Sequence, residues 1–194
     1  AIIYDINTPS AASGSVSPTV VENGTATYNT DFVVTNAELQ LTGWNFLGWA
    51  ISATATAAEY EAGATIASSV INAWYTKDGS TTLYAVWAQN KYNLTFVANT
   101  PATTNGTVTL IVNGSNITET QYVVTNAVTF DALVEIIALA ELGGWTFEGF
   151  YTANGAQLFD ATGAVVESAF DTIEGSDVYY TDANKNWIYD GNLT

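Results

Sequence analysis

The chain has 194 residues, and its hydrophobic fraction of 48% is sufficient for a substantial core. Nineteen acidic residues oppose three basic ones, and the formal net charge of −16 disfavours nucleic acid and anionic membranes as partners. Histidine and cysteine are absent, which excludes disulfides, thiol chemistry, His-dependent triads and the usual zinc sites.

Few residues are charged, so the surface polarity comes from uncharged side chains. Only 11% of residues are Asp, Glu, Lys or Arg, against roughly 25% in ordinary soluble domains. A surface rich in Thr, Ser and Asn is typical of extracellular β-proteins. No apolar run is long enough to cross a bilayer as a helix. We therefore expect an extracellular or cell-surface protein without membrane insertion.

Most segments read as strands, in the same order in two halves of the chain. DFVVTNA (31–37) recurs as QYVVTNA (121–127), and GWNFLGW (43–49) recurs as GWTFEGF (144–150). NTP occurs at 7–9 and again at 99–101. Such ordered self-similarity predicts a tandem duplication. We expect one module at 1–89, a second at 90–183 and a C-terminal linker or strand at 184–194.

The second copy carries an insertion after Ala127, because the spacing between matched segments widens there. The inserted stretch VTFDALVEIIALAELGG has apolar residues at helical spacing and a glycine at its end. We expect a helix at about 131–142, and only a short turn in the first copy. The fold class expected is α+β and β-rich, with mostly antiparallel strands packed against one helix.

A G-W-x-F-x-G motif followed by TTLYAVWA resembles the Listeria–Bacteroides repeat, or internalin B-repeat, of bacterial surface proteins. The resemblance covers most of both copies and implies two β-grasp-like modules without catalytic residues or cofactors. In the second copy the closing motif is degraded to VYYTDA. The motif residues are expected to be structural, with aromatic rings on both faces of a covered strand: Gly43, Trp44, Phe46, Gly48 and Trp49 in the first copy, and Gly144, Trp145, Phe147, Gly149 and Phe150 in the second.

The tail DANKNWIYDGNLT (182–194) has two readings. Asp182, Asn184, Asn186 and Asp190 are spaced like the start of a calcium loop, but Trp187 stands where such a loop needs glycine. Calcium is therefore a weak candidate, and no other cofactor is expected. The IYDGN of the tail also matches IYDIN (3–7). On this reading the tail is the first strand of a further copy, left without a sheet.

A strand without a sheet favours assembly through strand pairing. We expect a non-enzymatic structural subunit or segment of a surface filament, layer or stalk, joined to itself or to neighbouring surface proteins. Two alternatives stay open. One is a surface adhesin or carbohydrate-binding module using Trp74, Tyr75, Trp187 and Tyr189, and the other is a passive repeat spacer. The candidate assembly strands contain Ile2, Ile3, Tyr4, Ile6, Trp187, Ile188 and Tyr189.

Overall fold

A computed structural model describes residues 1–75 and 79–194. The chain divides into two compact units, Ala1–Gln89 and Asn90–Thr194. Both are built mostly from small antiparallel sheets, and the described residues contain one helix. The chain is therefore β-rich, as expected. Among the described residues, no helix combines the length and the apolarity that crossing a membrane requires.

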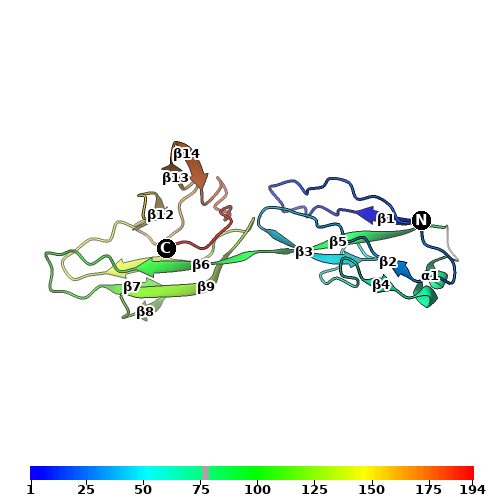
Figure 1. Ribbon diagram of the computed structural model, residues 1–194. Helices are drawn as coiled ribbons and strands as arrows, with labels where there is room; N and C mark the ends of the chain where they lie inside the picture. Colours follow the sequence, from blue (N-terminus) through cyan, green and yellow to red (C-terminus); the bar gives the residue numbers. More distant parts are fainter. Residues whose placement is uncertain (76–78) are drawn as a thin grey trace. The chain divides into compact units, whose positions relative to one another are not determined.

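A three-stranded sheet forms the centre of the first unit (Figure 1). Strand β5 (Thr81–Gln89) lies in the middle, parallel to β1 (Ile2–Asp5) on one side and antiparallel to β3 (Trp44–Ala50) on the other. Strand β5 contributes Leu83 and Ala85, both fully buried, to the core. Strands β2 (Phe32–Val33) and β4 (Thr65–Ile66) form a separate short pair.

The helix α1 (Ser68–Tyr75) lies in the first unit, directly after β4. The backbone N–H of Ser68 donates a hydrogen bond of 2.7 Å to the carboxylate of Asp31, which caps the start of the helix. Ile71 is almost completely buried, and Trp74 packs partly buried against the same core. The helix thus covers one side of the core through an apolar face.

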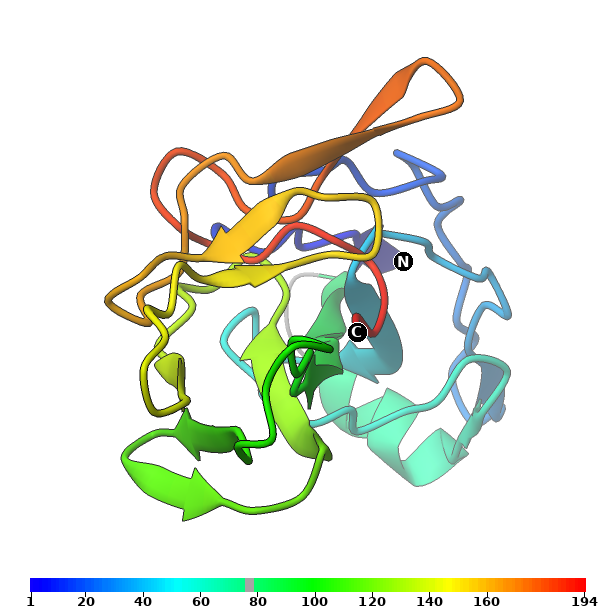
Figure 2. The ribbon, with the colours of Figure 1, turned by 90° about the vertical axis from the view of Figure 1, so that its left-hand side faces the viewer.

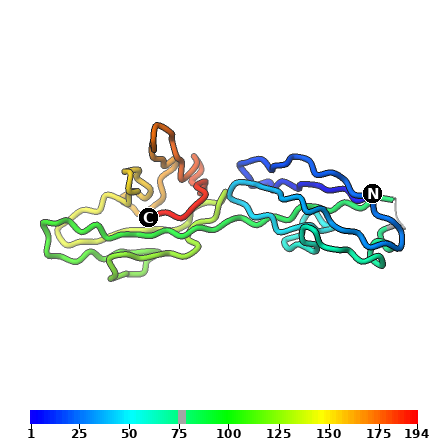
Figure 3. The backbone as a smooth tube through the Cα atoms, viewed as in Figure 1, coloured from blue at the N-terminus to red at the C-terminus, as the bar shows by residue number. Residues whose placement is uncertain are grey.

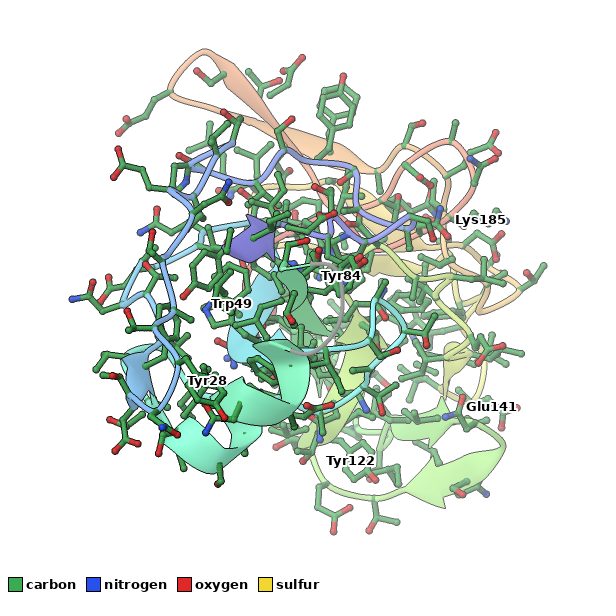
Figure 4. The ribbon with its side chains drawn as sticks, turned by 90° about the vertical axis from the view of Figure 1, so that its right-hand side faces the viewer. Tyr28, Trp49, Tyr84, Tyr122, Glu141 and Lys185 are labelled. Atoms are coloured by element: carbon green, nitrogen blue, oxygen red, sulfur yellow. The ribbon has the colours of Figure 1, made fainter. Side chains whose placement is uncertain are left out.

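Aromatic rings dominate the core of the first unit. The ring of Trp49, labelled in Figure 4, is fully buried. It meets the ring of Tyr4 edge-on at a centroid distance of 4.8 Å. Phe46 lies 5.3 Å from Trp49 and 5.4 Å from Trp87 of β5. This packing covers β3, but the strand lies at the edge of its sheet, beside β5. The expectation of a central strand with aromatic rings on both faces is wrong: Phe46 and Trp49 contact each other in one core, and the register of β3 shifts between Phe46 and Gly48.

The second unit contains nine strands among the described residues, arranged in small sheets (Figures 1 and 2). The longest strands, β6 and β9, pair antiparallel. In a three-stranded sheet, β7 lies between β10 and β8. Two further hairpins follow in the sequence. The strands are β6 (Lys91–Val97), β7 (Thr109–Val112), β8 (Ser115–Ile117), β9 (Gln121–Thr129), β10 (Ala138–Glu141), β11 (Phe150–Tyr151), β12 (Gln157–Phe159), β13 (Phe170–Ile173) and β14 (Ser176–Tyr179), paired as β6–β9, β10–β7–β8, β11–β12 and β13–β14.

The prediction of a helix at 131–142 is wrong, because the structure has no helix there. Residues 131–137 form turns and irregular backbone, and the rest of the stretch begins with β10, which pairs with β7. The N–H of Ala138 donates to the carbonyl of Gly163, and the N–H of Val134 donates to that of Lys185. Backbone partners from distant segments therefore replace the local bonds of a helix. The apolar spacing is used instead to bury Val134, Ile136 and Ala138.

Candidate functional site

One hollow in the second unit is an apolar groove of about 870 Å³. One wall is the last half of β6, and the other is the segment from Trp145 to Ala153. We call this hollow the β6 groove. The residues on which the argument below rests are Leu94, Phe96, Val97, Trp145, Phe147 and Phe150.

The two walls are spaced like two strands of the first unit. Phe96 and Phe150 meet edge-on at 5.0 Å with an interplanar angle of 65°, and Tyr4 and Trp49 meet at 4.8 Å and 61°. These residues are at matched positions of the predicted duplication. The ring centroids of Phe147 and Phe150 are 5.2 Å apart, and those of Phe46 and Trp49 are 5.3 Å apart. The walls of the groove therefore correspond to β1 and β3.

The space between these walls is filled by a strand in the first unit alone. There β5 pairs with β1 and with β3. In the second unit, none of the described strands pairs with Trp145–Gly149, and this segment has irregular backbone where its counterpart is β3. Trp145 is 51% exposed, whereas its counterpart Trp44 is partly buried against the core. The groove is thus the position of a missing central strand.

Two glycines of the repeated motif have the same backbone geometry in both units. Gly48 and Gly149 have φ angles of 129° and 139°, a region that side chains rarely adopt. A Cβ on Gly48 would lie 2.6 Å from the carbonyl oxygen of Tyr60, and a Cβ on Gly149 would meet that of Phe159. Gly43 and Gly144 also have positive φ. Gly48 and Gly149 therefore permit close approach of a neighbouring backbone, whereas nothing lies within 4 Å of a Cβ added to Gly144.

The end of the tail enters one end of the β6 groove. Leu193 pairs in parallel with Leu94: its N–H donates to the carbonyl of Asn93 at 3.1 Å, and its carbonyl accepts from the N–H of Thr95 at 2.8 Å. Figure 3 shows this end of the chain running alongside β6. In the first unit the N–H of Thr81 donates to the carbonyl of Ala1 at 3.0 Å. Leu193 thus takes the place that Thr81 has at the start of β5.

The expectation that the tail is a strand without a sheet is wrong, because its middle lies in the interior of the second unit. The side chain of Trp187 is fully buried. Its backbone N–H donates a hydrogen bond to the carbonyl of Ala132, and its backbone carbonyl accepts one from the backbone N–H of Asp131. The N–H of Ile188 donates to the carbonyl of Tyr180. Tyr189 is half-buried and lies 5.1 Å from the ring of Tyr180. These residues anchor the tail within its own chain.

The N-terminal candidates for assembly also have partners within their own unit. Ile2 and Tyr4 are buried, and Ile6 packs partly buried against the core. Ile3 is 36% exposed. The N–H and the carbonyl of Ile2 both bond to Gly24, on the side of β1 that faces away from β5. Strand β1 is therefore paired on one side throughout and on the other side at Ile2.

The four predicted calcium ligands have hydrogen-bond partners of their own. The carboxylate of Asp182 accepts bonds from the backbone N–H groups of Asn184 and Asn186, each at 2.8 Å, and from the Asn186 amide at 2.9 Å. Burial raises the pKa of Asp182, but these bonds outweigh it and leave the pKa lowered. Asp190 accepts from the Tyr92 hydroxyl instead. Across residues 1–75 and 79–194, no three acidic side chains are grouped as for a metal ion.

The second unit also contains a buried polar cluster that no sequence motif predicts. Asp171 is 4% exposed, and its carboxylate accepts bonds from the hydroxyls of Thr152 at 2.5 Å and Tyr180 at 2.8 Å, and from the N–H of Ala156 at 2.9 Å. Burial raises the pKa of Asp171, and the three bonds together lower it below its ordinary value. The same burial, together with the bond to Asp171, raises the pKa of Tyr180. The cluster joins the β11–β12 hairpin to β13.

Two of the aromatic residues expected to bind sugars, Trp74 and Trp187, have rings that pack in the interior. Trp187 is buried, and Trp74 packs against Tyr60 at 6.0 Å. The side chain of Tyr75 lies outside the described part of the chain. Exposed aromatic rings lie elsewhere, and two of them, Trp145 and Tyr151, each 51% exposed, line the β6 groove.

Comparison of the chain with protein-family models, with curated proteins and with solved structures finds no match.

Proposed function

We propose that this chain is a non-enzymatic, extracellular structural segment that joins neighbouring polypeptides by β-strand pairing. The observation that carries the proposal is the β6 groove, where backbone and apolar side chains lie in the arrangement that surrounds β5 in the first unit. An added strand brings many backbone hydrogen bonds at once, which suits a chain without disulfides.

The composition supports the same role. With a formal net charge of −16, copies of this chain repel one another at long range. Association must therefore come from a specific, short-range fit and must strengthen when salt screens the charge. Strand insertion into an apolar groove has both properties.

Electron microscopy and light scattering of the purified chain at low and at physiological salt test the proposal. We expect ordered fibres, layers or defined oligomers, with more assembly at the higher ionic strength. A chain that stays monomeric at every concentration and salt level contradicts self-assembly. Assembly that disappears on adding salt would point to charge pairing in place of strand pairing.

The second candidate function is glycan binding, and the exposed rings of Trp145 and Tyr151 are the observation in its favour. Aromatic rings at the rim of a groove stack on sugar rings. Glycan-array screening of the chain and of the Trp145→Ala variant tests it. Binding that the substitution abolishes, from a chain that remains monomeric, would favour this candidate over the structural one.

A further inference from the structure

The β6 groove has a defined strand-accepting geometry, and the first unit supplies the template for it. We propose that the groove accepts one β-strand from a neighbouring polypeptide, inserted parallel to β6 and antiparallel to residues 145–151. The inserted strand takes the place of Leu83–Gln89 of β5, in which Leu83 and Tyr84 pair with β1 and the residues from Tyr84 onward pair with β3. This proposal rests on the proposed function and specifies its acceptor site.

The direction of the inserted strand follows from the tail. Leu193 already pairs in parallel with Leu94, as Thr81 pairs with Ile2. Thr194 then matches Thr82, and the open part of β6 begins where Tyr4 meets Leu83 in the first unit. Because alternate N–H groups of a strand point to opposite sides, the N–H of Val97 points into the groove, like that of Thr95. The N–H of Ala98 points the other way, to the carbonyl of Thr120.

The side chains of the inserted strand follow from the walls. In the first unit, Leu83 and Ala85 are fully buried, and Trp87 lies 5.4 Å from Phe46. Phe147 occupies the position of Phe46 and lines the groove. We therefore expect an aliphatic residue opposite Phe96, a small residue two positions later and an aromatic residue two positions after that, stacked on Phe147.

Charge restricts the partner further. The charged side chains that line the groove are Glu141 and Glu148, both acidic. An acidic strand would be repelled, whereas an uncharged or basic strand would not. The sequence LYAVWAQ of residues 83–89 is uncharged and supplies a suitable probe. Strand β1 is already buried in its own unit, so the described chain does not offer its N-terminus without unfolding.

The experiment measures fluorescence anisotropy of a labelled LYAVWAQ peptide on titration with the full chain. Saturable binding is expected, at least tenfold weaker for a peptide with Ala85→Lys, because that position is fully buried in the template. The protein variants are Val97→Pro, which removes the N–H that points into the groove, and the matched Val97→Ala, which keeps it. Val97 is 44% exposed, so neither variant removes much packing. We expect a tenfold or larger loss of peptide affinity for Val97→Pro and little change for Val97→Ala.

A second protein carries LYAVWAQ fused directly after Thr194. If the groove takes this strand, the fusion melts at a higher temperature than the natural chain and no longer binds free peptide. Fusion that stabilises the chain while free peptide fails to bind would overturn the proposal of a partner strand. Equal affinity of Val97→Pro and Val97→Ala would also overturn it. If the chain binds the peptide but never assembles, the strand-accepting groove stands and the proposal of self-assembly is refuted. Failure of the groove proposal can therefore be distinguished from failure of the proposed function.

Discussion

Tyr180 donates a hydrogen bond of 2.8 Å to the buried carboxylate of Asp171, which also holds the hydroxyl of Thr152. Replacing Asp171 by Asn leaves the shape similar but removes the charge that strengthens three bonds. We expect the Asp171→Asn variant to lose about 2 kcal/mol of unfolding free energy at neutral pH, since charge-assisted bonds contribute about 1.5–3 kcal/mol. Chemical denaturation measures the loss. Thr172→Ala, which removes an exposed hydroxyl bonded to Asp177, is the mild control.

The pH dependence of the same variant follows from the lowered pKa of Asp171. A carboxyl whose folded pKa lies below its ordinary 3.8 stabilises the fold above that pH, and the contribution is lost as the pH falls through the folded pKa. We therefore expect the stability gap between the natural chain and Asp171→Asn to be full at pH 6 and to shrink below about pH 4. Thermal unfolding from pH 7 to pH 2 checks it. A gap that stays constant would contradict the charged hydrogen-bond network.

The motif glycines should tolerate no side chain. Gly149→Ala places a methyl group against the carbonyl of Phe159 at a φ of 139°, and we expect a loss of about 2 kcal/mol or more. Gly48→Ala should behave alike against Tyr60. Gly143→Ala is the matched control, because no atom lies within 4 Å of its added Cβ and its φ is not positive. Comparable destabilisation of the control and the motif variants would refute the close-approach role.

Tail residues should contribute to stability by burial. Trp187 is fully buried, and Trp187→Ala should destabilise the second unit by about 3–5 kcal/mol, the usual cost of removing a buried large aromatic ring. Trp145→Ala removes the same side chain at a site that is 51% exposed and should cost much less. Hydrogen exchange can localise the effect to residues 90–194. Equal costs for the two variants would mean that the tail does not pack as described.

Calcium should leave the fold unchanged. The carboxylate oxygens of Asp182 already accept three bonds from nitrogen donors, and Asp190 accepts from Tyr92. We expect the melting temperature of the EDTA-treated chain to be the same with and without millimolar calcium. An upward shift that Asp182→Asn abolishes would revive the metal-loop interpretation of DANKN.

Patterns that depend on local backbone geometry could be predicted from the sequence, whereas patterns that depend on distant partners could not. The motif glycines and the β-rich character were predictable, because positive φ and strand composition are local properties. The stretch at 131–142 has helical spacing, but Gly163 and β7 supply strand-type partners that no local rule anticipates. The actual helix begins at Ser68 because Asp31, far away in the sequence, caps it.

The candidate site was predictable only in part. The closing motif of the second copy is degraded to VYYTDA, and the structure places β14 in a hairpin with β13 in place of a central strand. The tail was matched to a first strand, yet Leu193 pairs as the beginning of a central one. Sequence similarity between IYDGN and IYDIN is too short to distinguish these positions. The Thr152–Asp171–Tyr180 cluster could not be predicted, because its members come together through tertiary packing.

The parallel pairing of β1 with β5 has a mechanical consequence for the first unit. These strands lie near its two ends, so tension applied at Ala1 and Gln89 would slide one strand along the other. Bonds loaded lengthwise must break together, whereas the bonds of a hairpin pulled open at one end break one at a time. The first unit is therefore built to resist stretching. In the second unit the corresponding parallel contact is limited to Leu193, and an inserted strand would extend that resistance to Phe96 and Val97 at the end of β6.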